Sequence, residues 1–165
     1  MNSKDHPFIP VGFNIPEKLE NEQFLIRMLT VKDLIKDYEA VMTSIDHLKG
    51  VFGPETTWPS KNLTLEQDLI DLGWHQKEFQ KRSSFAYTVM SPDEQECLGC
   101  VYIYPTKKET FDAEVFLWVR KSAFANGMDM VLFENVKHWI KEIWPFRMVA
   151  YPGREISWEE YQQSK

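Results

Sequence analysis

The spacing of apolar residues changes along this chain, and that change limits what the chain can fold into. In the first half, apolar side chains recur every three or four residues, as in amphipathic helices. Phe85–Met90, Cys97–Tyr104 and Ala113–Val119 are instead short runs rich in aromatic and β-branched residues, which are typical of strands. Helical spacing returns over Gly127–Ile143, and Phe146–Tyr151 is again strand-like. This order predicts a mixed α/β (α+β) fold.

Local signals place the remaining elements. Phe24–Leu29 is an apolar run that predicts a first strand, and Thr30 caps the helix that follows it. Capping boxes that begin at Thr64 and Ser157 predict a second helix and a short terminal helix. Helices therefore stand on both sides of the strands in the sequence, and we expect them to flank both faces of one sheet.

Connection lengths predict the direction of the strands. The three strands between residues 85 and 119 have short connections, which favour an antiparallel meander. The strand–helix–strand unit over Ala113–Tyr151 can form a right-handed crossover with two parallel strands. The expected sheet is therefore mixed, central and mostly antiparallel.

Prolines set the N-terminal segment apart. Pro7, Pro10 and Pro16 argue against a helix there, so we expect an extended arm over residues 1–23, with at most one short strand at Phe8–Phe13. Residues 24–165 are long enough for a single domain with its own core.

Composition excludes several classes of protein. The net charge is −6 without a basic run, which disfavours nucleic-acid binding. No apolar run is long enough to span a bilayer, and the first residues lack a signal-peptide core. Cys97 and Cys100 are too few for a disulfide framework, so we expect a cytoplasmic protein with reduced thiols. They should point to opposite faces of a strand, and the four histidines are scattered, so no metal site is predicted.

The element order resembles the GNAT N-acetyltransferase superfamily over residues 24–163. One local pattern supports the resemblance: Trp118-Val119-Arg120 runs into Asn126-Gly127-Met128. The resemblance implies acetyl-CoA as a cosubstrate. It implies that the cofactor is bound by the end of the fourth family strand and the start of the next helix, here Trp118, Val119, Asn126, Gly127 and Met128.

The cofactor loop departs from the family pattern Q/R-x-x-G-x-G/A. Gly127 matches its first glycine, but Phe124 stands at the Gln/Arg position and Asp129 at the second glycine. An acidic side chain in the first turn would repel a phosphate held by the helix N-terminus. A purely structural interpretation fits the same residues, with Asn126 as an N-cap and Asp129 complementing the helix dipole.

The resemblance also implies catalytic residues. Glu114, on the fourth family strand, would be the general base, with Asp112 as a weaker substitute. Tyr161 or Tyr151 would be the general acid, and a backbone N–H near Trp118 or Val119 would bind the thioester oxygen. The alternatives are an exposed strand-end glutamate and tyrosines that only pack.

Two further features have open interpretations. The aromatic residues Trp58, Trp74, Phe79, Phe85 and Tyr87 form either core or the wall of an acceptor pocket. Arg154 is either solvated or pairs with a substrate carboxylate or phosphate.

The leading hypothesis is an N-acyltransferase that moves an acetyl group from acetyl-CoA to a small-molecule or peptide amine. The alternatives are an inactive GNAT-fold binding or regulatory protein and an unrelated α/β domain with a small apolar ligand. Only Pro152–Lys165 follow the last predicted strand, so its edge would need cover from the N-terminal arm or from a second subunit in a homodimer.

Overall fold

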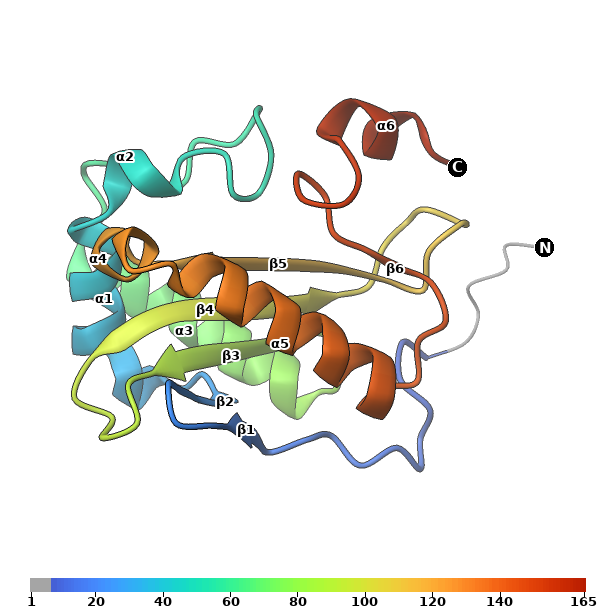
Figure 1. The fold of residues 1–165 in the computed structure, drawn as a ribbon, viewed down its shortest axis with the longest axis horizontal. Helices are drawn as coiled ribbons and strands as arrows, with labels where there is room; N and C mark the ends of the chain where they lie inside the picture. The colour runs from blue at the N-terminus through green and yellow to red at the C-terminus, as the bar shows by residue number, and fades with distance from the viewer. Residues whose placement is uncertain (1–6) are drawn as a thin grey trace.

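One six-stranded sheet organises the computed structural model, which describes residues 7–165 (Figure 1). The strands are β1 (Lys18–Glu20), β2 (Leu25–Met28), β3 (Phe85–Met90), β4 (Cys97–Tyr104), β5 (Ala113–Val119) and β6 (Val149–Ala150). The helices are α1 (Leu34–Met42), α2 (Ile45–Leu48), α3 (Leu65–Gln80), α4 (Lys121–Ala125), α5 (Met128–Ile143) and α6 (Trp158–Gln163), and a 3-10 turn, Val31–Asp33, precedes α1.

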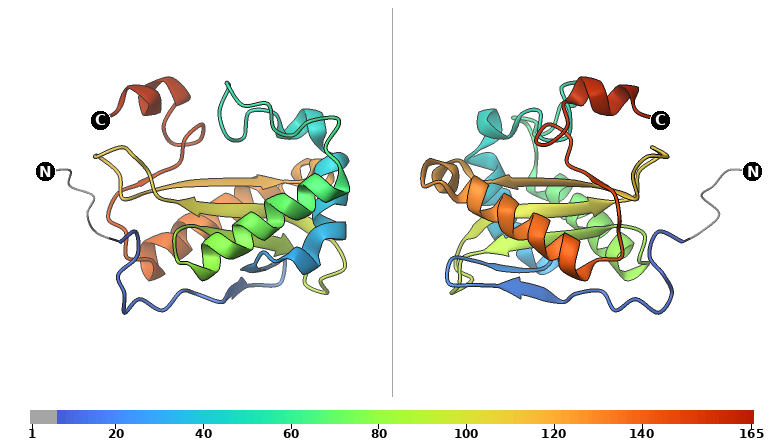
Figure 2. Two further views of the ribbon diagram at one scale, coloured as in Figure 1. Left: turned by 180° about the vertical axis from the view of Figure 1, so that it is seen from behind. Right: turned by 45° about the vertical axis from the view of Figure 1, so that its right-hand side comes forward.

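The strands lie in the order in which they occur in the sequence. Every neighbouring pair is antiparallel except β5 and β6, which are parallel. Helix α5 covers one face of the sheet, and α1 and α3 cover the other (Figures 1 and 2). The predicted mixed, mostly antiparallel sheet with helices on both faces is confirmed.

Strands β5 and β6 pair only where β5 begins. Ala113 pairs with Val149 and Glu114 with Ala150, so β6 is much shorter than the predicted Phe146–Tyr151. Asp112 fixes this start, since its Oδ2 accepts from the backbone N–H groups of Arg147 and Met148 at 2.7 and 2.9 Å. Beyond Ala150 the chain leaves the sheet, so the rest of β5 has no strand paired to it on this side. The opening between this part of β5 and the chain after β6 is called the split.

Two hydrophobic cores result from the alternation of side chains along the strands. On β5, Val115, Leu117 and Val119 join the core beneath α5, whereas Phe116 and Trp118 join the core beneath α1. Each face of the sheet is thus apolar where a helix covers it. Glu114 shares the α1 face with Phe116, as the alternation predicts.

The N-terminal arm contributes to the fold, and its strand is not where the sequence predicted it. Phe8–Phe13 contains bends and a turn, in which the Phe13 N–H donates to the Pro10 carbonyl at 2.9 Å. The strand is Lys18–Glu20, which pairs with β2 at the far edge of the sheet from β6. Ile9 is buried in the core beneath α5, and Phe8 stacks on Phe146 just before β6.

The helix that follows β5 starts differently from the prediction. A separate short helix, α4, comes first, and Asn126 is its C-cap instead of the N-cap of α5. Gly127 takes the N-cap position of α5 with a φ of +78°, a left-handed conformation that glycine adopts without strain. The chain can therefore turn sharply from α4 into α5.

One expectation about side-chain direction was wrong. A β-bulge between β3 and β4 shifts the register near Val89, so Cys97 and Cys100 lie in the same core and do not face opposite sides. On helix α3, Leu72 and Asp68 are buried, whereas Leu65 and Leu69 are exposed.

Candidate functional site

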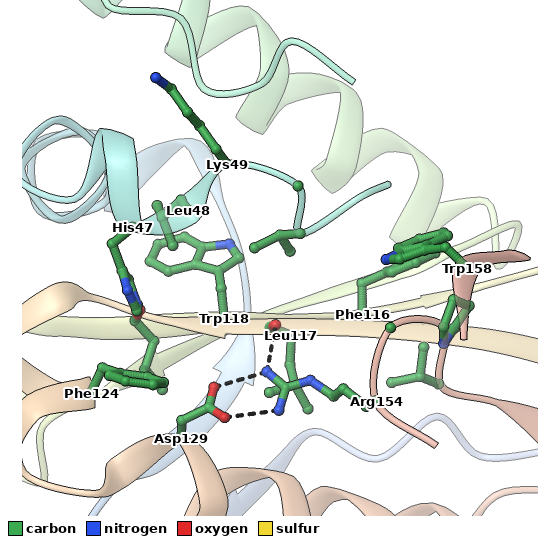
Figure 3. A pocket seen from close by; sticks show the side chains of 16 residues that line it. His47, Leu48, Lys49, Phe116, Leu117, Trp118, Phe124, Asp129, Arg154 and Trp158 are labelled. Carbon is green, nitrogen blue, oxygen red and sulfur yellow. Dashed lines mark hydrogen bonds and ion pairs between the residues drawn. The ribbon is translucent and has the colours of Figure 1, made fainter. Parts of the chain in front are cut away.

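A cavity of about 290 Å³ lies in the split beside β5 and is called cavity 1 here (Figure 3). Its walls are β5, the turn after β6 and the chain that follows α2. The lining residues are His47, Leu48, Lys49, Gly50, Val51, Val115, Phe116, Leu117, Trp118, Val119, Phe124, Asp129, Pro152, Gly153, Arg154 and Trp158.

An ion pair bridges the split at the start of α5. The guanidinium of Arg154 donates to both carboxylate oxygens of Asp129, at 2.9 and 2.8 Å, and to the Leu117 carbonyl at 3.2 Å (Figure 3). Because Arg154 compensates the charge of Asp129, the first turn of α5 presents less negative charge than the sequence suggests. Within the described chain, no side chain caps the start of α5.

The backbone of β5 faces the split at alternate residues. The Leu117 carbonyl accepts from Arg154, and the Val119 carbonyl lies 3.0 Å from Nε2 of His47, which donates to it. The N–H of a strand residue points to the same side as its carbonyl, so Leu117 and Val119 direct their N–H groups to the split. Trp118 instead directs its backbone toward β4 and lines cavity 1 with its indole.

A larger cavity of about 500 Å³, called cavity 2, lies under α1 and α3, on the face of the sheet to which Phe116 and Trp118 point. Phe116 lines both cavities and stacks on Trp158 with ring centroids 5.9 Å apart. The residues that line cavity 2 are Leu29, Asp37, Phe52, Trp58, Asp68, Asp71, Leu72, Trp74, His75, Tyr102, Tyr104, Glu114 and Phe116.

Glu114 and Tyr161 meet at the edge of cavity 2. The hydroxyl of Tyr161 in α6 donates to Oε2 of Glu114, and it lies 2.8 Å from the Thr106 hydroxyl. Burial, followed by the hydrogen bond to Glu114, raises the pKa of Tyr161 above its ordinary value. The phenol therefore stays protonated and holds the carboxylate of Glu114 in place.

A pair of buried carboxyl groups lies in the wall of cavity 2. Asp37 of α1 and Asp68 of α3 are 5% and 4% exposed, and their carboxyl groups are close enough to affect each other's pKa. Burial raises the pKa of Asp68 to about 6 and that of Asp37 well above its ordinary value, and the Asp68 charge adds to the latter effect. The pair therefore shares a proton at a pH where ordinary carboxyl groups have lost theirs.

The structure distributes the predicted site residues over several places. Trp118 and Val119 line cavity 1, whereas Asn126, Gly127 and Met128 are not among its lining residues. Tyr151 packs edge-on against Phe133 and lines neither cavity. The roles predicted for these residues stay predictions.

The structure also shows where the remaining candidate residues of the sequence analysis lie. The carboxylate of Asp112 accepts hydrogen bonds from the backbone N–H groups of Arg147 and Met148, just before β6. Trp58 and Trp74 line cavity 2, but Phe79, Phe85 and Tyr87 pack in the core beneath α5. Arg154 is partly buried in its pair with Asp129 instead of solvated.

Sequence reasoning missed His47, Lys49, His75 and the Asp37–Asp68 pair. A signal for the pair was present, because Asp37 lies three residues after Leu34 and four before Val41, on the apolar side of α1. Asp68 stands four residues before Leu72 in the same way. An aspartate inside an apolar stripe indicates a buried carboxyl group with a special environment. His47 and Lys49 carried no comparable signal.

Comparison with known proteins identifies the fold. No family model and no curated protein matches the chain. Among solved structures, the ribosomal-protein-S5-alanine acetyltransferase of Vibrio fischeri matches with a TM-score of 0.59 at 16% identity, over 74% of this chain and 66% of the other. The RimL ribosomal L7/L12 α-N-protein acetyltransferase, solved with coenzyme A, matches with a TM-score of 0.57 at 13% identity, over 76% and 66%.

A third match is the microcin C7 self-immunity acetyltransferase MccE, solved with acetyl-CoA and AMP. Its TM-score is 0.57 at 10% identity, over 78% of this chain and 70% of the other. These matches show that the 165-residue chain described above has the GNAT acetyltransferase fold. It spans about two thirds of the length of the first two matched chains.

In this GNAT fold, both cavities are lined by residues of β5, the strand that borders the split.

Within residues 7–165, no three His, Cys, Asp or Glu side chains are placed to hold a metal ion. No helix in this range is long and apolar enough to cross a membrane. Burial raises the pKa of the Cys97 thiol to about 12 and that of Cys100 well above its ordinary value, so neither is a reactive thiolate.

Proposed function

We propose that this protein is an N-acyltransferase that moves an acetyl group from acetyl-CoA to a primary amine. The observation that carries the proposal is the meeting of two cavities at Phe116, beside a carboxylate held by a tyrosine. Cavity 1 would hold the acyl-CoA and cavity 2 the amine. The activities of the structural neighbours support the reaction class.

The residues around cavity 1 fit an acyl-CoA. The start of α5 lacks a side-chain cap and so offers backbone N–H groups and a positive dipole end to an anion. Nothing lies within 4 Å of the place where a Cβ on Gly127 would stand, so the backbone is open there. Arg154, Lys49 and His47 would supply further donors to the phosphates. The cofactor supplies the activated acetyl thioester.

The chain's own residues would perform three tasks in the transfer. Glu114 accepts the proton of the attacking amine as a general base, and Tyr161 positions its carboxylate. As the new C–N bond forms, the C–S bond breaks and coenzyme A leaves as a thiolate that takes a proton from water. The N–H groups of Leu117 or Val119 bind the thioester oxygen as it gains charge. Because the raised pKa of Tyr161 makes the phenol a weak acid, we assign Tyr161 this positioning role before that of the general acid.

One observation favours the second candidate, a GNAT-fold binding protein without catalysis. Asp129 places a carboxylate in the turn of α5 that would meet the phosphates, and Arg154 compensates it in the structure. Binding of acyl-CoA would require Arg154 to donate hydrogen bonds to the phosphates while it remains near Asp129. The two candidates therefore differ in whether acetyl-CoA binds and is turned over.

Calorimetric titration with acetyl-CoA tests the proposal. We expect binding that Arg154→Met weakens about 10-fold or more, because a bidentate donor to phosphate is lost. Asp129→Asn should tighten binding roughly 2- to 5-fold, since it removes a negative charge at a helix N-terminus. Glu142→Gln is the matched control, an exposed carboxylate removed from the same helix near its other end.

The absence of acetyl-CoA binding to the wild-type protein at millimolar concentration would contradict the proposal. Binding without acetyl transfer to any primary amine would favour the non-catalytic candidate. Thermal unfolding of each variant shows whether a change in affinity reflects a change in folding.

A further inference from the structure

Every charged side chain that lines cavity 2 within residues 7–165 is a carboxylate, apart from His75. Asp37, Asp68 and Asp71 come from α1 and α3, and Glu114 comes from β5. Burial lowers the pKa of His75 to about 4, so its ring is neutral near pH 7. The lining of cavity 2 thus contains four carboxyl groups and no lysine or arginine.

One of these carboxylates has a buried oxygen without a partner. Oδ2 of Asp68 is buried and accepts no hydrogen bond, although the residue is more than nine-tenths buried and lies in the cavity wall. A buried carboxylate oxygen without a donor costs free energy unless a ligand supplies one. This oxygen indicates that the cavity is built for a ligand that donates hydrogen bonds and carries positive charge.

Aromatic rings form most of the remaining wall. They are Phe52, Trp58, Trp74, Tyr102, Tyr104 and Phe116. Phe52 lies at the centre of this group, with ring centroids 5.1 Å from Trp58, 5.0 Å from Tyr102 and 5.5 Å from Phe116. Aromatic faces attract organic ammonium groups and cover methylene chains, whereas a metal ion needs additional oxygen ligands. The wall therefore favours an alkylammonium ligand.

The acidic groups stand at two ends of the cavity. Asp37 acts electrostatically on Cys100 and Tyr102 of β4, whereas Glu114 pairs in register with Tyr104 of the same strand. The Asp37–Asp68 pair and Glu114 therefore act at different positions along the same strand in the cavity wall.

We propose that cavity 2 binds a linear diamine or polyamine, with one ammonium at the Asp37–Asp68 pair and a second amine beside Glu114. The methylene chain between them lies against Phe52 and the neighbouring rings. The inference rests on the proposed function only where it takes the second amine as the acetyl acceptor. Binding of the diamine itself requires no acyl-CoA.

The carboxyl pair adds a property that can be measured separately. Asp33 and Asp71 act on it electrostatically from the helical side, Cys97, Cys100 and Tyr102 lie near it on β4, and His75 lines the same cavity. Arg27 holds Asp33, and the thiols and the phenol stay protonated because burial raises their pKa values. An ammonium at Asp68 favours the charged form of the pair, so binding should release the shared proton.

Isothermal titration calorimetry with putrescine, spermidine and n-butylamine tests the proposal on the full chain. We expect putrescine and spermidine to bind at least 10-fold more tightly than the monoamine. Asp68→Asn should remove most of this preference while changing n-butylamine binding less than 3-fold. Near pH 6.5, the wild-type enthalpy should depend on the ionisation enthalpy of the buffer, and that dependence should vanish in Asp68→Asn. Glu66→Gln, an exposed carboxylate on the same helix, is the matched control.

Equal affinity for diamine and monoamine would overturn the inference, as would diamine binding that Asp68→Asn leaves unchanged. Competition by Mg²⁺ at equal concentration would also overturn it in favour of a metal site. Diamine binding that depends on Asp68 in a protein that does not bind acetyl-CoA would support the cation site and contradict only the proposed function. Asp68→Asn removes a buried charge and should fold, which thermal unfolding verifies.

Discussion

At the scale of single residues, the site depends on how tertiary contacts change ordinary side chains. Glu114 stands on a strand next to exposed Asp112, yet only Glu114 receives a tyrosine hydroxyl and faces a cavity. Asp129 and Arg154 are 25 residues apart and neutralise each other across the split. A motif alone would assign Asp129 the role of repelling phosphate, whereas its partner decides how much charge it presents.

Glu114→Gln tests the general base. The variant keeps the shape of the side chain and removes its basicity, so kcat for acetyl transfer to spermidine should fall roughly 100-fold or more. The dissociation constant for acetyl-CoA should stay within about 2-fold, because Glu114 does not line cavity 1. If spermidine is not a substrate, the most active primary amine of a panel takes its place.

Tyr161→Phe accompanies this variant as a test of positioning. It keeps the ring that packs near Trp158 and Phe111 but removes the donor to Glu114. We expect an intermediate loss of kcat without a change in acetyl-CoA affinity. Full activity of Glu114→Gln would show that water or another group accepts the proton of the amine, and it would contradict the assignment of Glu114 as the base.

At the scale of elements, the close approach of β4 and β5 depends on one glycine. A Cβ on Gly99 would lie 2.0 Å from the Trp118 carbonyl oxygen and 3.1 Å from Cα of Val119, both backbone atoms that cannot rotate away. Residues 116–119 of β5 line cavity 1, so the position of this wall depends on that approach. The β-bulge that brings Cys97 and Cys100 to the same face lies in the same region.

Gly99→Ala should therefore destabilise the protein by about 1–3 kcal/mol or more, as overpacking of backbone against backbone does. Gly73→Ala provides the contrast, because its Cβ would meet only Cγ1 of Val31 at 3.8 Å. In the middle of α3 the alanine should stabilise the protein by about 0.5–1 kcal/mol. Urea denaturation measures both differences, and equal midpoints for Gly99→Ala and the wild type would contradict the steric argument.

At the scale of the whole molecule, the arm, the sheet and both helical layers form one structure. The arm contributes Ile9 to the core beneath α5, and the Tyr87 hydroxyl donates to the Pro16 carbonyl at 2.7 Å. Arg120 connects α1 with β4, since it pairs with Glu39 at 2.6 Å and donates to the Cys97 carbonyl at 3.2 Å. The buried Asp37–Asp68 pair lies between these layers, so its protonation affects the stability of the entire fold.

The free energy of unfolding should depend on pH through this pair. The folded protein binds a proton up to about pH 6 at Asp68 and higher at Asp37, whereas an unfolded aspartate loses its proton near pH 4. The native state therefore holds more protons over this range, and stability should fall as the pH rises from about 4 through 6. At neutral pH the stabilisation that comes from protonated Asp68 is lost, because this pH lies above its folded pKa of about 6.

Asp68→Asn cannot ionise at this position and should flatten that decline. At pH 8 we expect it to be about 1 kcal/mol or more stable than the wild type, because a buried carboxylate is replaced by a neutral amide. Urea denaturation between pH 4 and 8 measures the effect, with Glu66→Gln as the control. A wild-type stability that rises over this range would show that other carboxylates dominate.

The sequence determined the elements and their layering, because periodicity and capping act over a few neighbouring residues. The strands over Phe85–Val119, the helix α5 and the parallel pairing of the last strand all follow from local patterns. The sequence also placed Glu114 and Phe116 on one face through strand alternation. It placed the N-terminal strand wrongly, since three-residue β1 has only its pairing with β2 to define it.

Only the tertiary structure decided the composition of the two cavities. Glu114 and Tyr161, Asp129 and Arg154, and Asp37 and Asp68 each come from separate elements, and no local spacing relates them. Their charges also depend on burial, which is a property of the packed molecule and not of the residue type. Local sequence fixes which backbone conformations are cheap, whereas long-range packing selects which side chains meet and in what protonation state.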